Sequence, residues 1–333
     1  MTPAAFDVVG IGNAIVDVLT HVEDAFIAAQ GLVKGSMALV DADRSDRLYA
    51  AMGPGVEVSG GTAANTMAGI ASLGGRVAYV GKVRDDQLGE VFAHDIRAAG
   101  VSYATAPATD GPGTARCLIL LTPDAERTMN TYLGASAELE PGDVDAALVA
   151  SSAVTYCEGY LWDAPAAKAA ITAGMDAARS AGRQVAFTLS DGFCVDRHRR
   201  EFSHLVGERV HVLFANETEI CSLFEVNELH RAVDAVRGHC RLACVTRGER
   251  GSVLVTAEEA VEVPAHPVAL VIDTTGAGDL YAAGVLFGLT HDLDLETCGR
   301  LGSLAAAEVI SHVGARPEVS LADLAQRELG LRV

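Results

Sequence analysis

The chain contains little positive charge. Its 333 residues include 25 lysines and arginines against 44 aspartates and glutamates, so its formal net charge at pH 7 is −19. Proteins that bind nucleic acids or anionic membrane surfaces need a basic surface to do so. The composition therefore argues against nucleic acids and membrane surfaces as partners.

Signals for membrane insertion, secretion and zinc binding are also lacking. No run of 18 apolar residues occurs, so we expect no membrane-spanning helix. The segment Thr2 to Asp7 has no basic start and ends in an acid, so we expect no signal peptide and a cytoplasmic protein. None of the seven cysteines belongs to a Cys-x-x-Cys pair, which favours reduced thiols over a zinc site.

Two common phosphate-binding loops are absent or incomplete. The one Gly-Lys pair, Gly81-Lys82, is followed by Val83 and has no glycine five residues earlier, so the chain has no Walker A loop. Gly10-Ile11-Gly12 begins like a dinucleotide fingerprint, but Ile15 occupies the third small position. These departures exclude a P-loop kinase and make an NAD-dependent enzyme a poor candidate.

Half of the residues are hydrophobic, and they fall into short β-branched runs that alternate with alanine-rich helical stretches. This alternation predicts an α/β fold with a doubly wound, mostly parallel sheet and helices on both faces. The strands are expected at residues 7–11, 77–80, 154–157, 184–189, 210–214, 243–246 and 252–256, and the main helices at residues 63–73, 88–99, 164–181, 217–224 and 301–312.

Residues 14–40 and 113–133 break the alternation, because they contain strand-like runs without a long helix between them. These runs are expected to pair into a small antiparallel sheet outside the main layer, with strands at residues 14–20, 36–40, 115–121 and 127–132. No low-complexity linker separates them from the rest. We therefore expect one domain over residues 1–333 with an inserted small sheet.

The most informative segment is Asp273–Asp279, with the sequence DTTGAGD. It lies between an apolar β-like run at residues 268–272 and an apolar helix-like run at residues 280–289. A glycine-rich turn at the start of a helix exposes backbone N–H groups and, with the helix dipole, forms an anion site. Gly276 and Gly278 would allow positive φ angles and close backbone approach.

A carboxylate beside an anion site calls for an explanation, because it repels the anion. Asp279 would have a use there if it accepts the proton of a hydroxyl that attacks phosphorus. The alternative is an ordinary acid in the first helical turn, where the helix dipole favours negative charge. The second acid, Asp273, and the flanking helix favour the catalytic interpretation.

This segment, followed by Tyr281-Ala282-Ala283-Gly284, resembles the C-terminal signature of the ribokinase-like (PfkB) carbohydrate kinase family. The resemblance implies that Asp279 is the catalytic base and that the amides of Gly276, Ala277 and Gly278 form the anion hole. It also implies that Asp273 is a ligand of a monovalent cation such as K⁺. The inserted small sheet would be the lid that this family places over its substrate.

Polar residues near the N-terminus suggest an acceptor site. Asn13 and Asp17 follow the first expected strand. Their side chains could hydrogen-bond the hydroxyl groups of a polyol, and the alternative is that they are simply exposed to solvent. Gly60-Gly61 precedes a helix and, on its own, could be a simple helix start with Thr62 as N-cap. The resemblance implies that one set of residues binds the hydroxyl groups of the acceptor: Asn13, Asp17, Gly60, Gly61 and Asn65.

Other motifs fit a nucleotide site. Asn216 and Glu219 have the spacing of a capping box, and the resemblance adds that this pair organises Mg²⁺ through water. Arg127 is either a surface residue or the family's lid arginine that reaches the transferred phosphoryl group. The resemblance further assigns to the ATP site Thr246, Gly248, Gly251, His266 and Ser303.

Three further segments resemble the adenosine kinase subgroup: Glu158–Tyr160, Thr188–Ser190 and Phe214–Glu219. The resemblance implies ATP- and Mg²⁺-dependent phosphorylation of a nucleoside 5′-hydroxyl, with adenosine as the leading acceptor. Ile15, Met129 and Tyr160 would form the base pocket, although such residues are also ordinary core.

The segment Thr62–Ala64 departs from other family members, so the acceptor stays open. The alternatives are a sugar kinase acting on ribose, fructose or a keto-sugar acid and, outside this class, a non-catalytic nucleotide sensor. Both a monomer and a lid-mediated homodimer fit the sequence.

Overall fold

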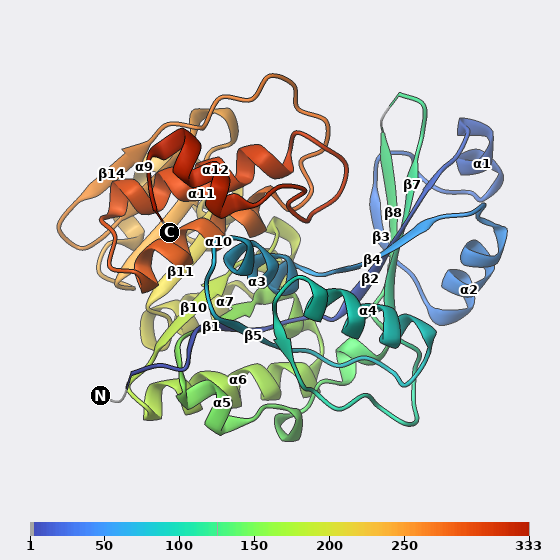
Figure 1. Ribbon diagram of the computed structural model, residues 1–333, viewed down its shortest axis with the longest axis horizontal. Coiled ribbons are helices and arrows are strands. Elements are labelled where there is room, and N and C mark those ends of the chain that lie inside the picture. The colour runs from blue at the N-terminus through green and yellow to red at the C-terminus, as the bar shows by residue number, and fades with distance from the viewer. Residues whose placement is uncertain (1–2, 125, 333) are drawn as a thin grey trace.

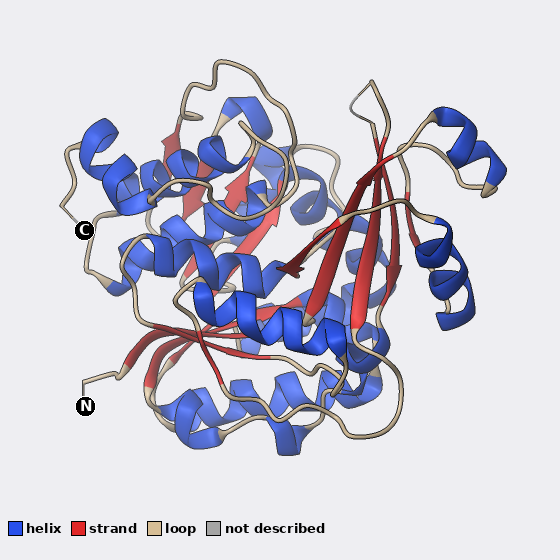
Figure 2. Ribbon diagram, turned by 45° about the vertical axis from the view of Figure 1, so that its right-hand side comes forward, coloured by secondary structure: helices blue, strands red, loops and turns tan. Residues whose placement is uncertain are grey.

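The structure is a computed structural model that describes residues 3–124 and 126–332. In this part of the chain the strands form one large and one small sheet (Figure 1). The small sheet stands beside the main body, and the view in Figure 2 shows it on the right with its own helices. None of the helices described is long and apolar enough to cross a bilayer.

The large sheet has the strand order β14-β13-β12-β11-β10-β9-β1-β5-β6. The strands from β12 to β6 are parallel to their neighbours, and β13 and β14 extend this sheet in antiparallel pairing. The prediction of a mostly parallel sheet is confirmed. Its strands are β1 (Phe6–Ile11), β5 (Val77–Val80), β6 (Ser102–Tyr103), β9 (Ser152–Glu158), β10 (Gln184–Thr188), β11 (Val212–Asn216), β12 (Leu242–Thr246), β13 (Ser252–Val255) and β14 (Ala260–Val263).

Helices cover both faces of the large sheet, because its strands bury alternate residues on opposite sides. Val8 of β1 packs in one core with Leu280, whereas Val9 packs in a second core with Ile171. The first face is covered by α3 (Thr62–Ser72), α4 (Gln87–Ala98), α10 (Ala277–Thr290), α11 (Leu295–Val309) and α12 (Leu321–Leu329). The second face is covered by α5 (Ala146–Ala150), α6 (Pro165–Ser180), α7 (Gly192–Glu208), α8 (Glu217–Leu223) and α9 (Leu229–Val236).

The small sheet has the order β3-β8-β7-β2-β4 and is mixed rather than antiparallel throughout. The pairs β2–β4 and β7–β8 are antiparallel, whereas β2–β7 and β3–β8 are parallel. The two short helices α1 and α2 lie against one face of it (Figure 1). The elements are β2 (Ile15–His21), α1 (Asp24–Ala29), β3 (Met37–Leu39), α2 (Ala42–Ala51), β4 (Val56–Gly60), β7 (Ala115–Leu121) and β8 (Arg127–Tyr132).

The strand order creates a crevice at one edge of the large sheet. From β1 the chain continues outward to β5 and β6, whereas from β9 it continues in the opposite direction to β10, β11 and β12. Ligands of open parallel sheets bind at such a reversal, beside the carboxyl ends of the strands. Asn13, Glu158, Asn216 and Thr246 lie at or just after the carboxyl ends of β1, β9, β11 and β12.

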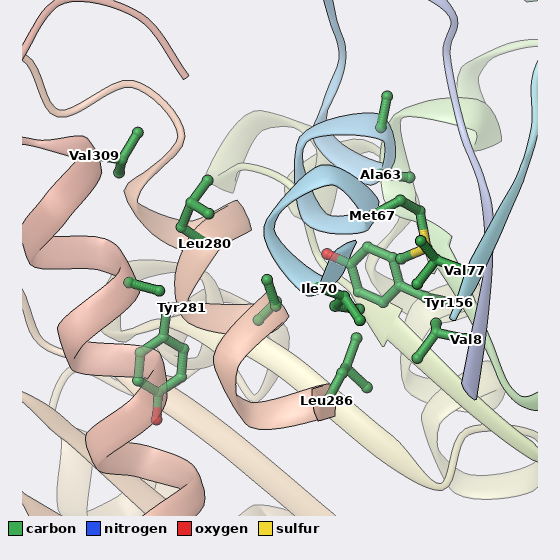
Figure 3. Close-up of a cluster of buried hydrophobic side chains, with 14 of the residues drawn as sticks. Val8, Ala63, Met67, Ile70, Val77, Tyr156, Leu280, Tyr281, Leu286 and Val309 are labelled. Atoms are coloured by element: carbon green, nitrogen blue, oxygen red, sulfur yellow. The ribbon is translucent and has the colours of Figure 1, made fainter. Parts of the chain in front are cut away.

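Helices α3 and α10 pack closely and bring distant parts of the sequence together. Figure 3 shows Met67 and Ile70 of α3 in one cluster with Leu280 and Leu286 of α10. A Cβ atom at Gly69 would lie 2.6 Å from Leu280 Cδ1, so a larger residue would push the helices apart. This contact fixes the positions of the two helices relative to each other.

The expectation that the apolar run at residues 268–272 forms a strand is wrong. This segment is a loop, and Leu270, Val271 and Ile272 are 67%, 55% and 45% exposed. Its recorded backbone bond runs from Ile272 N–H to Ile310 O at 2.8 Å, to the end of a helix and not to a strand. An apolar run forms a strand only when a neighbouring strand supplies partners. The glycine-rich turn therefore follows a loop.

Candidate active site

A buried carboxylate organises the start of the site. Glu158 Oε1 accepts hydrogen bonds from Asn13 N (2.8 Å) and Asn13 Nδ2 (2.6 Å), and Oε2 accepts one from Ala63 N (2.9 Å). Burial raises the pKa of Glu158 to about 7, although these bonds oppose the rise. A Cβ atom at Gly12 would lie 2.5 Å from Glu158 Oε2. Gly12 therefore makes room for this carboxylate, which explains the glycine directly after β1.

In the sequence, Glu158 stands out only as part of the segment that resembles adenosine kinases, and no local pattern predicts its contacts with Asn13 and Ala63. Its partners Asn13 and Ala63 are 145 and 95 residues away in the chain. The signal that could have pointed to it is an acid at the end of an otherwise apolar strand, where a buried charge needs donors.

The two glycines before α3 close around the acceptor residues predicted from the sequence. Gly61 has φ = 99°, and a Cβ atom there would lie 2.2 Å from Asn13 O. A Cβ atom at Gly60 would lie 2.4 Å from Asp17 Oδ2. Larger residues at these positions would displace Asn13 or Asp17.

Asp17 lies on the half-buried face of β2. Burial raises its pKa to about 7, and the positive charges of Arg316 and Arg127 partly offset this effect. Among the described residues, no hydrogen bond to the Asp17 carboxylate is recorded. A carboxylate removed from water without donors is a candidate ligand-binding group.

The glycine-rich turn forms the N-terminus of α10. Gly276 is the N-cap residue in the left-handed conformation with φ = 79°, and the helix starts at Ala277. Gly278 lies inside the helix, so of the two glycines only Gly276 uses a positive φ. A Cβ atom at Gly278 would meet no atom within 4 Å, so its glycine leaves open space at the helix start. The first N–H groups of a helix have no acceptor within the helix.

Asp279 is in the first turn of α10 and faces α3. Its Oδ2 accepts a hydrogen bond from Asn65 Nδ2 at 2.9 Å. Burial raises the pKa of Asp279 to about 6, whereas Asn65 and the charge of Arg316 lower it. Asp279 is therefore mostly ionised at neutral pH and can accept a proton.

Arg127 connects the small sheet to the glycine-rich turn. Its Nη2 lies 2.5 Å from Asp273 Oδ2, and its Nη1 donates to Thr275 Oγ1 at 2.6 Å. The Asp273 carboxylate also accepts from Thr275 N (3.0 Å) and Gly314 N (2.8 Å). The guanidinium thus lies against the anion turn, while Asp273 already has three partners.

A cavity of about 580 Å³ lies beside the C-terminal helices, and we call it the C-terminal cavity. Its wall contains the five residues that the resemblance assigned to the ATP site: Thr246, Gly248, Gly251, His266 and Ser303. Three residues of the segment Asp273–Asp279 also line it: Thr274, Ala277 and Gly278. The loop at residues 265–268 and Val271 close one side of this cavity.

A second cavity, of about 260 Å³, is the polar cavity, and it shares Thr246 and Gly278 with the first. Asn216, Glu219 and Asp279 line it. Asn216 and Glu219 form the expected capping box, with Glu219 N to Asn216 Oδ1 and Asn216 N to Glu219 Oε2 both at 2.9 Å. Burial raises the pKa of Glu219 to about 7.

The polar cavity has few direct ligands for a metal ion. Among the described residues, no group of three His, Cys, Asp or Glu side chains could hold one. Mg²⁺ keeps several of its waters and binds through substrate phosphates. The pair Asn216 and Glu219 therefore fits a magnesium ion that arrives on a nucleotide and is held through water.

A third cavity, of about 360 Å³, lies at the junction with the small sheet, and we call it the junction cavity. It is lined by Asp17 and Asn65, and also by Arg316, which the sequence analysis missed. Since Asn65 holds Asp279, this hydrogen bond links the junction cavity to the polar cavity. The three cavities therefore form a row with Asp279 between the second and the third.

Two of the three expected base-pocket residues share one face of the small sheet, and the third lies on a different element. The strand registers place Ile15, Met129 and Arg127 on the same face of the small sheet as Asp17. Tyr160 instead follows β9 and packs against the core on the other face of the large sheet. Burial raises its pKa, and so do the nearby carboxylates of Asp191, Glu219 and Asp279. None of Ile15, Met129 and Tyr160 belongs to the wall of the junction cavity.

Comparison with known proteins places the chain among the sugar and nucleoside kinases. The family model described as pfkB family carbohydrate kinase matches residues 35–321. The crystal structure of an adenosine kinase from Sinorhizobium meliloti is 54% identical, with a TM-score of 0.91 over 97% of this chain and 99% of that one.

Two further relatives differ in the acceptor that their names indicate. The structure of a probable sugar kinase from Rhizobium etli is 48% identical, with a TM-score of 0.92 over 98% of this chain and all of that one. An adenosine kinase of Saccharomyces cerevisiae is 27% identical, with 91% of this chain and 94% of that protein covered.

Proposed function

The chain belongs to the pfkB family of carbohydrate kinases, and we propose that it transfers the γ-phosphoryl group of ATP to the 5′-hydroxyl of a nucleoside, with adenosine as the main acceptor. The observation that carries this proposal is the position of Asp279. It lines the polar cavity and is hydrogen-bonded to Asn65, which lines the junction cavity.

In this account ATP occupies the C-terminal cavity, and its phosphates extend into the polar cavity. The acceptor occupies the junction cavity, where Asp17 can accept hydrogen bonds from its secondary hydroxyls. Asp279 takes the proton of the primary hydroxyl while the hydroxyl oxygen forms a bond to the γ-phosphorus. The bond between the γ-phosphorus and the bridging oxygen breaks, and the products are ADP and the phosphorylated acceptor.

The chain's own donors would stabilise the transferred group. The amides of Gly276, Ala277 and Gly278 lie at the positive end of α10, next to Asp279. Arg127 would leave Asp273 and donate to the phosphoryl oxygens. Bound Mg²⁺ would offset charge on the phosphates, and Asn216 and Glu219 would hold it through water.

Asp273 would act as a ligand for K⁺ only after Arg127 has moved. Its carboxylate now has the guanidinium and two backbone amides as partners. Departure of Arg127 would leave a buried carboxylate without a counter-charge, which a monovalent cation could supply.

The choice of adenosine rests on the 54% identical adenosine kinase and on the apolar residues Ile15 and Met129 beside Asp17 on the small sheet. The alternative acceptor is a free sugar, which the 48% identical probable sugar kinase supports. In both cases the reaction at Asp279 is the same.

Product analysis tests this proposal. The purified chain is incubated with ATP, Mg²⁺ and adenosine, and the products are separated and identified by mass spectrometry and ³¹P NMR. We expect AMP and ADP in equal amounts, and both should form at least about a thousandfold more slowly with Asp279→Asn. ADP without a phosphorylated acceptor, across adenosine, ribose and fructose, would contradict the proposal.

A further inference from the structure

Arg316 is an arginine of the junction cavity to which the reaction described above gives no role. It follows α11 in the segment Gly314–Pro317 and is held against β4 by two hydrogen bonds, from Nε to Ser59 O (3.2 Å) and from Nη2 to Ser59 Oγ (3.1 Å). These bonds fix the plane of the guanidinium, because both go to one residue. The third nitrogen, Nη1, is buried and has no hydrogen-bond partner.

Two more polar groups of the same cavity are also without partners. Asn65 uses its Nδ2 for Asp279, and its Oδ1 is buried and unpaired. No hydrogen bond to the Asp17 carboxylate is recorded among the described residues. The inner wall of the cavity therefore presents one unpaired donor, Arg316 Nη1, and two acceptors, Asp17 and Asn65 Oδ1, while the polar side chains of His21 and Glu318 in the same wall are exposed. Buried polar groups are costly unless a partner satisfies them.

The combination of donor and acceptors matches hydroxyl groups. A hydroxyl donates one hydrogen bond and accepts others, so it can donate to Asp17 and accept from Arg316 at once. An anionic group would satisfy Arg316 but would be repelled by Asp17 in the same cavity. The balance of charges in the cavity therefore favours a neutral diol over a carboxylate or phosphate.

We propose that Arg316 is a specificity-determining residue that donates from Nη1 to one of the vicinal secondary hydroxyls of the acceptor, while Asp17 accepts from them. The inference rests on the proposed function, because it places the acceptor in the junction cavity. It adds a charged donor to a hydroxyl site in which the other groups without a partner, Asp17 and Asn65 Oδ1, are acceptors. An acceptor that lacks this hydroxyl leaves a buried guanidinium nitrogen unpaired and is penalised.

The test compares wild type with Arg316→Gln on adenosine, 2′-deoxyadenosine and 3′-deoxyadenosine at saturating ATP and Mg²⁺. A hydrogen bond to a charged donor contributes about 1.5–3 kcal/mol, which corresponds to a loss of roughly 10- to 150-fold in kcat/KM for adenosine. For one of the two deoxynucleosides the variant should equal wild type within about threefold, because the hydroxyl in question is already missing. The KM for ATP should not change.

Two controls separate this role from a structural one. Arg327→Gln removes an exposed arginine of α12 and should leave all three rates unchanged. Ser59→Ala removes one anchor of the guanidinium and should produce the same pattern with a smaller loss, and it replaces Arg316→Gln if that variant does not fold.

The outcomes distinguish this inference from the proposed function. An equal loss on all three nucleosides would show that Arg316 only supports the fold, and it would overturn the inference while leaving the kinase activity in place. A wild-type protein that phosphorylates neither adenosine nor ribose nor fructose would contradict the proposed function itself. If ribose is the better acceptor, the same comparison is made with ribose, 2-deoxyribose and 3-deoxyribose. It then decides in the same way whether Arg316 contacts a secondary hydroxyl or only supports the fold.

Discussion

Like Glu219, three other acids of the site have raised pKa values, and all of these rises come mainly from burial. The pKa is about 7 for Asp17, about 7 for Glu158 and about 6 for Asp279. They differ in their partners, because Glu158 accepts three hydrogen bonds, Asp279 accepts one, and none to Asp17 is recorded in the described part of the chain. Glu158 is thus satisfied by the protein, whereas Asp17 and Asp279 keep capacity for a ligand.

The base assignment predicts a large effect of Asp279→Asn. We expect kcat to fall about a thousandfold or more, because the amide cannot accept the hydroxyl proton. Acceptor binding, measured by calorimetry, should change little. The control Glu296→Gln removes an exposed acid from the first turn of α11 and should leave kcat unchanged. More than a tenth of the wild-type kcat in Asp279→Asn would exclude this residue as the base.

The raised pKa of Asp279 predicts a pH dependence. The base must be ionised to work, so kcat/KM should fall as the pH drops through about 6. Protonation of Asp17 near pH 7 should weaken acceptor binding and therefore also lower kcat/KM as the pH drops. A pH–rate profile measures this. The residual rate of Asp279→Asn should lack the limb near pH 6. A wild-type profile that stays flat down to about pH 5 would contradict the assignment.

Asp17 should lower the stability of the protein at neutral pH. Its pKa is about 7 in the folded protein and about 3.9 when unfolded, so the folded state binds more protons between these values. The free energy of unfolding therefore decreases as the pH rises from about 4 to about 7. Asp17→Asn should raise Tm at pH 8 and abolish acceptor binding.

The gain in Tm for Asp17→Asn should shrink toward about pH 4, where Asp17 is protonated in both states. Asp234→Asn, which changes an exposed acid of α9, serves as the control and should not alter Tm. A lower Tm for Asp17→Asn at pH 8 would show that the carboxylate stabilises the fold.

At the scale of elements, the site depends on contacts between segments that are far apart in the chain. Strand β8 of the small sheet reaches the turn before α10 through Arg127, 148 residues away from Thr275. Helix α3 reaches α10 through Asn65, 214 residues away from Asp279. The small sheet can therefore transmit a movement directly to the residues around the phosphoryl group.

This arrangement predicts that Arg127→Gln lowers kcat on the order of a hundredfold or more, because a cationic donor to the transferred group is lost. The KM for the acceptor should change by less than about threefold, since Arg127 does not line the junction cavity. Steady-state kinetics in both substrates measures this. Arg116→Gln in β7 is the matched control, because this arginine contacts Ser45 and Asp46 of α2 instead. An unchanged kcat in Arg127→Gln would show that Arg127 has no role in phosphoryl transfer and only connects the small sheet to Asp273.

Local sequence patterns predicted the elements that a neighbouring strand or an apolar face supports. The β-branched run at residues 77–80 and the run at 115–121 are strands with those bounds. The run at residues 268–272 is equally apolar but has no neighbouring strand, so it is a loop. Helix α7 was not predicted, because its sequence is mostly polar around Arg197–Glu201. Too few apolar residues such as Phe202 face the core to give a helical pattern.

The candidate site could be predicted only where its residues stand in short motifs. The glycine-rich turn and the pair Asn216 and Glu219 are local patterns with a physical reason. Arg316 has no such pattern, since its anchor Ser59 is 257 residues away and only the folded chain brings them together. The same holds for Tyr160, whose place on the other face of the sheet depends on how the chain leaves β9.

At the scale of the whole molecule, the row of cavities follows from the topology. The large sheet reverses its winding between β1 and β9, the small sheet stands beside that point, and α10 starts between them. The C-terminal cavity and the polar cavity consequently border the start of α10, and the junction cavity is linked to it through the hydrogen bond from Asn65 to Asp279. A reaction between two bound molecules needs such a geometry.

Whether the acceptor is a nucleoside can be decided by comparing kcat/KM for adenosine, ribose and fructose with ATP and Mg²⁺. The hydroxyl contacts of Asp17 and Asn65 are available to all three, so the difference must come from burial of the base. Roughly 3 kcal/mol from that burial corresponds to more than a hundredfold. The account predicts that adenosine exceeds both sugars by at least about that factor. A kcat/KM for ribose or fructose equal to that of adenosine would contradict it and assign the chain to the sugar kinases.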